Sequence, residues 1–445
     1  MPFVPNAEAD NKFMLEKIGV NSFDNLIEAI PNELRLKRDL DLPRQLSEFE
    51  VSKLLKQYAN KNLSAESHIC FMGGGAYDRF IPSIVLDTIG RAEFRTAYTP
   101  YQAEVSQGTL QAMYEFQSMI CELTQMDVSN ASMYDGASAL AEAALLANAQ
   151  TKKKDILIAG TIHPNYMSVI ESICKGRQLK FRTFISEDGT CNLDALKNSI
   201  DSDTAAVIVQ QPNFYGNMED VHEIEAITHS TKALFIVSID PISLGIMEAP
   251  GNYNADIVIG EGQSLGIPLS FGGPYLGLFA CKKKFIRKIP GRITGMTVDE
   301  EGKDGFVLTL QTREQQIKRE KATSNICTNQ GLFMLAATVY METMGRKGLI
   351  NVAENSFHNA HYLASEINKL DAYSIAIDKE FFAEFLVETP VPVRDIIDAG
   401  QKIGLLAGVD ISQFSGVKSG LLIAVTEKRN KEEMDSLVSF LKSFS

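Results

Sequence analysis

The chain of 445 residues has no tryptophan, six cysteines, six histidines and no excess of positive charge. Its 43 lysines and arginines are outnumbered by 56 aspartates and glutamates, which gives a formal net charge of −13. An acidic balance of this size repels phosphate backbones and anionic membrane surfaces. We therefore expect neither a nucleic-acid partner nor a membrane partner.

The few cysteines and histidines show no spacing typical of a metal site. No Cys-x-x-Cys pair occurs, and the cysteines are scattered along the chain, so we expect reduced thiols rather than zinc ligands. His358 and His361 lie three residues apart on a helical pattern, but no third ligand accompanies them. We expect these two side chains on a solvated helix face and predict no metal site.

Long apolar runs are also missing. No uninterrupted apolar stretch is long enough to span a bilayer, and the N-terminus has neither the basic region nor the apolar core of a secretion signal. A cytoplasmic location is therefore expected. Short-period repeats and low-complexity segments are absent as well, and 45% apolar residues with 22% charged residues are ordinary for a globular protein.

What the sequence does contain is an alternation of short β-branched runs and helical patterns of about 10 to 15 residues. The expected strands are 155–159, 179–184, 205–210, 233–239, 256–259 and 275–280. The expected helices are 105–126, one starting near residue 137, 166–174, 193–200 and 219–228. This alternation is typical of a mostly parallel sheet covered by helices, so the predicted fold class is α/β.

The patterning predicts three parts of the chain. Residues 1–70 carry helix-like stretches at 23–30 and 48–58, separated by prolines, and are expected to form a helical N-terminal arm. Residues 71–330 hold the large α/β domain, which a polar stretch ends at about residue 324. Residues 331–445 begin with a long helical region and end in a small C-terminal α/β domain, with strands at 384–387 and 421–425.

One local motif points to a dinucleotide. An expected strand runs into Gly260, Gly262 and Gly266, which is close to the glycine pattern of NAD-binding loops. In such loops the last glycine opens a helix that holds the pyrophosphate, but here Pro268 breaks any helix almost at once. We therefore reject a dinucleotide site.

Other candidate residues lie where expected strands end or helices begin. His163 lies just past one strand and Asp240 ends another, and such positions line the ligand crevice of an open α/β sheet. The segment 135–138 precedes a helical run, so its backbone N–H groups can face an anion or simply be capped by a side chain. Taken one by one, each of these residues is better explained as a turn or cap residue.

A basic run follows the last expected strand. It contains Lys282, Lys283, Lys284, Arg287, Lys288 and Arg292. We expect it to form the solvated surface of a helix, with docking of an acidic partner as the alternative.

Four segments are similar to stretches of glycine decarboxylases, the P-proteins of the glycine cleavage system. They are Gly-Gly-Gly-Ala-Tyr at 73–77, Thr-Pro-Tyr-Gln-Ala-Glu-Val-Ser-Gln-Gly at 99–108, Gly-Glu-Gly-Gln at 260–263 and Arg-Glu-Lys-Ala-Thr-Ser-Asn-Ile-Cys-Thr-Asn at 319–329. The resemblance implies the fold of the type I pyridoxal-phosphate enzymes, which are aminotransferase-like, with a large sheet domain and a small C-terminal domain.

By motif position, the resemblance assigns a cofactor pocket that lacks its lysine. Asp240 would meet the pyridine nitrogen, His163 would stack on the ring, and the turn ending at Ser138 would face the phosphate. The lysine that forms the internal aldimine should follow the strand at 256–259, where Gln263 and Ser264 stand instead. Because neither an amide nor a hydroxyl can form an aldimine, the resemblance implies a remnant pocket with no covalently bound cofactor.

The missing lysine makes the chain similar to the first, or alpha, subunit of the two-subunit form of the enzyme. That resemblance implies a homologous second subunit that carries pyridoxal phosphate, in an assembly of two alpha and two beta subunits. It also implies decarboxylation of glycine, with the aminomethyl group passed to the lipoyl arm of H-protein. The chain is not expected to be active alone.

The same resemblance nominates residues that could complete the partner's active site. They are Tyr98, Tyr101, Glu104, Thr323, Ser324 and Asn325. Tyrosine and glutamate could orient glycine or the lipoyl arm, and the Thr-Ser-Asn run could donate to the partner's phosphate. These residues could equally well only stabilise the complex, and a non-catalytic structural or regulatory subunit is therefore the alternative function. An independent lyase would need another lysine near the strand ends, and the sequence offers none there.

Overall fold

A computed structural model describes residues 6–38, 40–95, 98–414, 416 and 418–445. The chain divides into two compact units, Met1–Asn62 and Leu63–Ser445. The N-terminal arm predicted over residues 1–70 includes residues 1–5 and 39, which lie outside the described part.

The first unit is helical. It contains α1 (Glu8–Ile18), α2 (Phe23–Leu26), the 3₁₀ turn η1 (Asn32–Leu34) and α3 (Glu48–Ala59). The helix expected at 23–30 is shorter than predicted, whereas the one expected at 48–58 is α3. Its N-terminus is a capping box, in which Ser47 Oγ accepts from the Glu50 N–H at 3.3 Å and the Glu50 carboxylate accepts from the Ser47 N–H at 2.9 Å.

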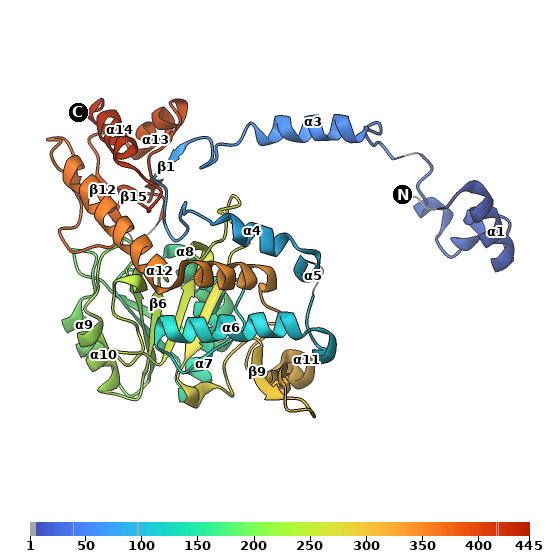
Figure 1. The fold of residues 1–445 in the computed structure, drawn as a ribbon, viewed down its shortest axis with the longest axis horizontal. Helices are drawn as coiled ribbons and strands as arrows, with labels where there is room; N and C mark the ends of the chain where they lie inside the picture. The colour runs from blue at the N-terminus through green and yellow to red at the C-terminus, as the bar shows by residue number, and fades with distance from the viewer. Residues whose placement is uncertain (1–5, 39, 96–97, 415, 417) are drawn as a thin grey trace. The chain divides into compact units, whose positions relative to one another are not determined.

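The second unit is built on a seven-stranded sheet with the strand order β2-β8-β7-β6-β5-β3-β4 (Figure 1). The strands are β2 (Val128–Ser129), β3 (Asp155–Ala159), β4 (Lys180–Phe184), β5 (Thr204–Gln211), β6 (Leu234–Ile239), β7 (Ile257–Glu261) and β8 (Gly277–Cys281). Strands β3 to β7 run parallel, while β8 is antiparallel to β7 and to β2. The predicted mostly parallel sheet is confirmed.

Helices cover both faces of this sheet because the buried side chains of each strand alternate between them. On β3, Leu157 packs in the core layer that contains α6 (Gln107–Thr124) and α12 (Gly331–Ile367). Ile156 and Ile158 pack in the opposite layer, beneath α7 (Gly136–Thr151) and α8 (Pro164–Cys174). Figure 1 shows α6 and α12 side by side across one face of the sheet. The remaining helices between the strands are α9 (Leu193–Ser199) and α10 (Val221–His229).

The C-terminal part contains a small antiparallel sheet with the order β11-β12-β15-β14. Its strands are β11 (Ser374–Ile375), β12 (Glu384–Glu388), β14 (Val409–Asp410) and β15 (Leu421–Ala424), accompanied by α13 (Val393–Lys402) and α14 (Lys431–Lys442). The short strand β1 (Ile69–Cys70) pairs in parallel with β13 (Leu405–Leu406). This pairing holds the start of the second unit against its end, and it brings the glycine cluster at 73–77 to the beginning of β12.

The sequence reading missed a hairpin. Strands β9 (Ile293–Val298) and β10 (Asp304–Thr309) pair antiparallel where only a polar interruption was expected. The first residues of β9 are buried, but its outer part is exposed, so the segment lacks the continuous apolar run that marked the other strands.

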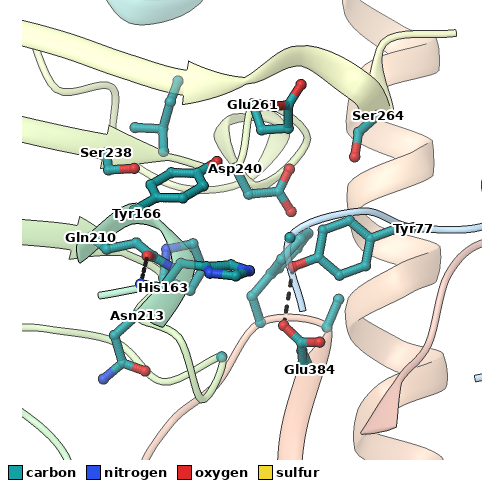
Figure 2. Close-up of a pocket in the computed structure, with 16 residues that line it drawn as sticks. Tyr77, His163, Tyr166, Gln210, Asn213, Ser238, Asp240, Glu261, Ser264 and Glu384 are labelled. Atoms are coloured by element: carbon teal, nitrogen blue, oxygen red, sulfur yellow. Dashed lines mark hydrogen bonds between the residues drawn. The ribbon is translucent and has the colours of Figure 1, made fainter. Parts of the chain in front are cut away.

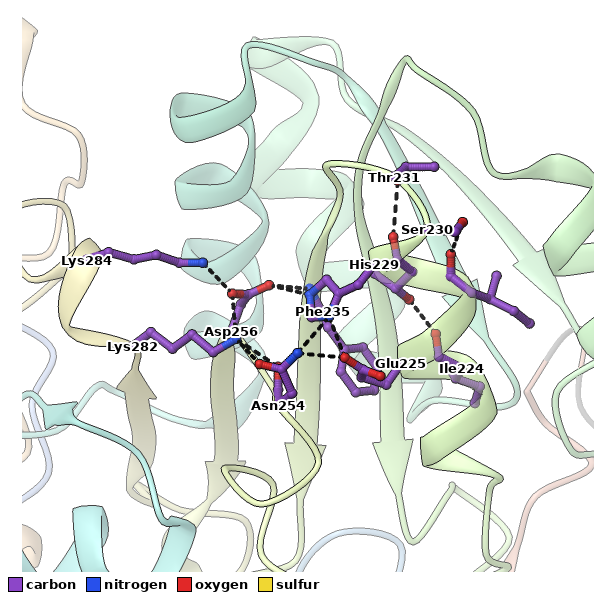
Figure 3. A network of polar contacts seen from close by, with 12 residues as sticks. Ile224, Glu225, His229, Ser230, Thr231, Phe235, Asn254, Asp256, Lys282 and Lys284 are labelled. Carbon is purple, nitrogen blue, oxygen red and sulfur yellow. Dashed lines mark hydrogen bonds and ion pairs between the residues drawn. The ribbon is translucent and has the colours of Figure 1, made fainter.

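The prediction of a basic helix surface is wrong. Only the three-residue turn η6 (Lys283–Phe285) forms there, because Lys282 and Lys284 extend to the buried Asp256 at the amino end of β7. Their ammonium groups lie 3.1 and 2.9 Å from its Oδ1, and His229 Nε2 lies 2.9 Å from Oδ2 (Figure 3). Arg292, in the same basic run, is only 3% exposed. The buried Asp256 carboxylate therefore lies at the centre of this charge cluster.

The two spaced histidines lie on α12 and make structural contacts. His361 Nε2 hydrogen-bonds to the Phe381 carbonyl at 3.0 Å, and its ring stacks on Phe381 at 4.1 Å, so the expectation of a fully solvated face is wrong for this residue. Across the described ranges, no group of three or more histidines, cysteines and carboxylates is arranged to hold a metal ion. Nor does any helix in those ranges have the length and apolar character needed to cross a membrane.

Candidate functional site

A pocket enclosing about 600 Å³, part of it open to solvent, lies where the parallel strands β3, β5, β6 and β7 end. The carboxyl ends of parallel strands line the ligand crevice in open α/β sheets. We call this the central pocket (Figure 2). Its lining includes Tyr77, His163, Tyr166, Gln210, Asn213, Ser238, Asp240, Glu261, Ser264 and Glu384.

The glycine cluster at 73–77 forms one wall of the pocket by close approach to Glu384. The Gly74 N–H donates to Glu384 Oε1 at 2.6 Å, and the Tyr77 hydroxyl donates to Oε2 at 3.0 Å. A Cβ atom on Gly73 would collide with the Glu384 carboxylate, and Gly74 has φ +76°, which favours glycine. The spacing alone did not indicate this purpose, because Glu384 lies more than 300 residues further along the chain.

His163 is placed in the pocket as a neutral ring. Its Nε2–H donates to the Gly74 carbonyl at 2.8 Å, and its Nδ1 accepts from the Asn165 N–H at 3.1 Å. Burial lowers the pKa of His163. Its ring stacks on Tyr166 with 5.0 Å between centroids and 19° between planes.

Asp240 follows β6 and points into the same pocket (Figure 2). Its Oδ1 accepts from the Ile242 N–H at 3.0 Å, and its Oδ2 lies 3.9 Å from the Arg79 guanidinium. Arg79 is itself bound to Glu427 at 2.7 Å. Burial raises the pKa of Asp240, and the charge of Arg79 only partly opposes that rise.

Gln263, one of the two residues that the resemblance puts at the lysine position, connects two parts of the pocket wall. Its Oε1 accepts from the Tyr77 N–H at 2.8 Å, and its Nε2 donates to the carbonyls of Tyr77 and Ile267 at 3.1 and 2.7 Å. The amide therefore joins the turn after β7 to the glycine-cluster wall. Ser264 is also buried, but its side chain lines the central pocket.

Carboxylates occupy the N-terminus of α7, where the resemblance places the phosphate. Glu261 Oε2 accepts from the Gly136 N–H at 3.0 Å, and its Oε1 accepts from Leu276 and Gln263 N–H groups at 3.0 and 3.2 Å. Asp135 Oδ1 accepts from the Ser138 N–H at 2.7 Å. The helix dipole favours these anions, although burial raises the pKa of Glu261 to about 7. Ser138 bonds back to Asp135 and does not line the central pocket.

The residues present do not fit pyridoxal phosphate. No lysine lies between Lys232 and Lys282, the stretch that contains the end of β7. The Tyr166 ring stacks on His163, and its hydroxyl lies so close to Gly136 that a Cβ atom there would collide with it. Glu261 holds the Gly136 N–H that a phosphate would need, and two carboxylates at this helix end repel a phosphate group. We therefore derive no reaction step through the cofactor in this chain.

The residues nominated for the partner's active site lie elsewhere. Tyr98 is 83% exposed and lines a separate pocket beside α6 and α12. Tyr101 is 46% exposed, and its hydroxyl donates to Gln316 Oε1 at 3.1 Å. Glu104 is exposed and makes no side-chain hydrogen bond or ion pair within the described ranges. None of the six nominated residues lines the central pocket.

Arg292 connects part of this second group, and the sequence reading missed its role. Its guanidinium donates to Thr328 Oγ1 at 2.8 Å, to the Cys327 carbonyl at 2.7 Å and to the Tyr101 hydroxyl at 3.4 Å. Thr323 and Ser324 line a shallow pocket that also includes Arg292, while Asn325 is exposed. The two family-like segments at 99–108 and 319–329 thus meet around one buried arginine, which had been counted only as part of a basic run.

Comparison with known proteins gives a consistent match over the whole chain. A family model described as glycine cleavage system P-protein matches residues 1–441. The chain is 55% identical over 442 residues to a probable glycine dehydrogenase (decarboxylating) subunit 1 from Chloroherpeton thalassium, covering 99% of both chains. It is 54% identical to the protein of the same description from Chlorobaculum parvum, covering 100% of both.

Solved structures match as well. A crystal structure of glycine decarboxylase (P-protein) of the glycine cleavage system, in inhibitor-bound form, superposes with a TM-score of 0.92 at 39% identity and full coverage of both chains. A glutamate decarboxylase from Lactobacillus brevis superposes with a TM-score of 0.68 at 13% identity, covering 92% of this chain and 95% of that one, which shows a shared fold alone. The predicted type I architecture is confirmed.

Proposed function

Since the chain belongs to the family of glycine cleavage system P-proteins, as subunit 1 of glycine dehydrogenase (decarboxylating), we propose that it acts only together with a second subunit that carries the cofactor. The observation that carries this proposal is the lysine-free end of β7. Gln263 and Ser264 stand there, while Tyr166 lies against Gly136 and Glu261 accepts from the Gly136 N–H at the start of α7. A chain arranged in this way has to obtain pyridoxal-phosphate chemistry from its partner.

The proposed partner is a homologous subunit with the aldimine lysine, in an assembly of two alpha and two beta subunits in the cytoplasm. When bound there, pyridoxal phosphate supplies the electron sink for decarboxylation of glycine. The aminomethyl group then passes to the lipoyl arm of H-protein. The full-length match to proteins described as subunit 1 supports a two-subunit enzyme.

We place this chain's contribution at the surface around Arg292. Tyr98, Tyr101, Glu104, Thr323, Ser324 and Asn325 would face the partner's active site there. The exposure of Tyr98 and Glu104 supports this role, because neither side chain makes a hydrogen bond or an ion pair within the described part of the chain. A carboxylate and a phenol at such a surface can orient an ammonium group or a lipoyl arm.

A purely structural or regulatory subunit is the second candidate. It is favoured by the contacts of Tyr101, whose hydroxyl already bonds Gln316 and receives a bond from Arg292 within the chain. A residue with these contacts within the chain can stabilise the conformation of the surface without touching substrate.

The cofactor part of the proposal is tested by absorbance. The purified chain and the co-purified two-subunit complex are incubated with pyridoxal phosphate, reduced with borohydride and freed of unbound cofactor. We expect a retained chromophore on the second subunit only, because reduction traps an aldimine to lysine. A reducible aldimine on this chain would contradict the proposal.

The surface part is tested by Tyr101→Phe and Glu104→Gln in the complex, with release of labelled carbon dioxide from glycine as the assay. If these groups touch substrate, kcat/KM falls about tenfold or more, since one lost hydrogen bond to a charged group is worth about 1.5–3 kcal/mol. Tyr114→Phe and Glu122→Gln on α6 are the matched controls. Unchanged turnover in both test variants, with the complex intact, would favour the structural subunit.

A further inference from the structure

The central pocket carries three carboxylates and no lysine or arginine among its lining residues. Asp240, Glu261 and Glu384 all line it (Figure 2), although the Glu261 carboxylate already accepts from three backbone N–H groups. Arg79 stands behind Asp240 at 3.9 Å but is held more closely by Glu427, at 2.7 Å. Since His163 is neutral, the pocket has an excess of negative charge in a buried place, where unpaired charge is costly.

Two serines that are buried as residues present their hydroxyls to the same pocket. Ser238 near the end of β6 and Ser264 after β7 are each 3% exposed, and both line the central pocket (Figure 2). Their side chains have no hydrogen-bond partner within the ranges that the structure describes. Neither oxygen is enclosed by protein atoms, so both hydroxyls are open to the pocket and free to bond a polar ligand.

The carboxylates keep acceptor capacity for such a ligand. Among the described residues, Glu384 accepts hydrogen bonds from Gly74 and Tyr77, and Asp240 accepts one from Ile242. An ionised carboxylate offers about four lone-pair positions, so each has room for further donors. A ligand with N–H donors and a positive charge can therefore bond these carboxylates and a serine hydroxyl.

We propose that the central pocket of this chain binds a small primary ammonium ion in place of pyridoxal phosphate. The inference concerns the chain by itself and goes beyond its role in the complex. An ammonium head supplies three N–H donors and neutralises buried negative charge. An anionic ligand is disfavoured by the three carboxylates, and a quaternary amine has no N–H to donate.

The protonation of the pocket supports this assignment. Burial raises the pKa of Glu384 and of Glu261 to about 7 each, so protons neutralise these groups when no cation is present. The other titratable or charged groups around them are Tyr77, Arg79, Asp135, His163, Tyr166, Asp240 and Glu427. An entering ammonium ion therefore displaces protons, and its binding weakens as pH falls below about 7.

The test is calorimetric titration of the purified full chain with methylammonium chloride at neutral pH. Tetramethylammonium chloride and potassium chloride serve as separate arms. We expect saturable one-to-one binding of methylammonium, heat that differs between buffers of different ionisation enthalpy because protons are released, and no binding of tetramethylammonium. No saturable methylammonium binding, or potassium binding as tight as methylammonium binding, would overturn the proposal.

Two variants locate the site. Glu384→Gln should weaken methylammonium binding about tenfold or more, as expected for loss of a charged hydrogen-bond partner. Glu354→Gln, on the exposed face of α12, is the matched control and should leave binding unchanged. If Glu384→Gln does not fold, Ser264→Ala replaces it and should weaken binding several-fold. Wild-type affinity in a folded Glu384→Gln or Ser264→Ala chain would overturn the placement.

Discussion

Gln263→Lys restores the residue type that the pyridoxal-phosphate fold requires, and we predict that it destabilises the chain without creating a cofactor site. The wild-type amide makes three buried hydrogen bonds, one from the Tyr77 N–H and two to the carbonyls of Tyr77 and Ile267. A lysine has no acceptor atom, so the Tyr77 N–H loses its partner. Leaving this buried N–H without a partner should lower the free energy of unfolding by about 1–3 kcal/mol.

No aldimine should form even in the folded variant, because Tyr166 already stacks on His163 and Glu261 already accepts from the Gly136 N–H, the two contacts that a cofactor ring and phosphate would use. The measurements are urea denaturation followed by circular dichroism, and absorbance with pyridoxal phosphate before and after borohydride reduction. Gln57→Lys, on the exposed surface of α3, is the control and should change neither readout. A stable Gln263→Lys chain with a reducible aldimine would refute the reasoning.

The remaining predictions concern charge and burial. Burial alone raises the pKa of Asp256, but hydrogen bonds from His229 and Lys284 outweigh it and hold that pKa well below the usual range (Figure 3). The carboxylate therefore stabilises the fold at neutral pH and loses this effect as pH falls below its unfolded pKa of about 4. Asp256→Asn should lower the free energy of unfolding by about 2–4 kcal/mol at pH 7. Measured by urea denaturation at a series of acidic pH values, the free energy of unfolding should also depend less steeply on pH in the variant; the same steepness as in the wild type would contradict this. The hydrogen bond to Asp256, and then the one to Glu225, raises the pKa of His229. Its contribution to the free energy of unfolding is therefore complete below about pH 6.5 and is lost as pH rises through its folded pKa. The decrease in the free energy of unfolding from pH 6 to 8 should accordingly be smaller in His229→Gln than in the wild type. Arg292→Lys removes the forked contacts to Cys327 and Thr328 and should lower the free energy of unfolding by about 2 kcal/mol, while Arg287→Lys, the control, should not.

The sequence determined the fold class and most of the elements. Alternating β-branched runs and amphipathic patterns predicted the strand at 155–159 to the residue and the other parallel strands to within about two. These strands can be predicted from the sequence because a strand that is buried on both faces of a parallel sheet needs a continuous run of apolar residues. The absence of a lysine after β7 was also visible in the sequence, and it needs no coordinates.

Only the tertiary structure decided how the central pocket is filled. Tyr77 and Glu384 meet across more than 300 residues, and Glu261 reaches the first turn of a helix that begins 125 residues before it. Such contacts arise from the crossing order of strands and from the return of β1 to β13, which leave no local periodicity in the sequence. The burial of Arg292 and Asp256 was hidden for the same reason. A charged residue in a basic or acidic stretch looks solvated until the elements that cover it are in place.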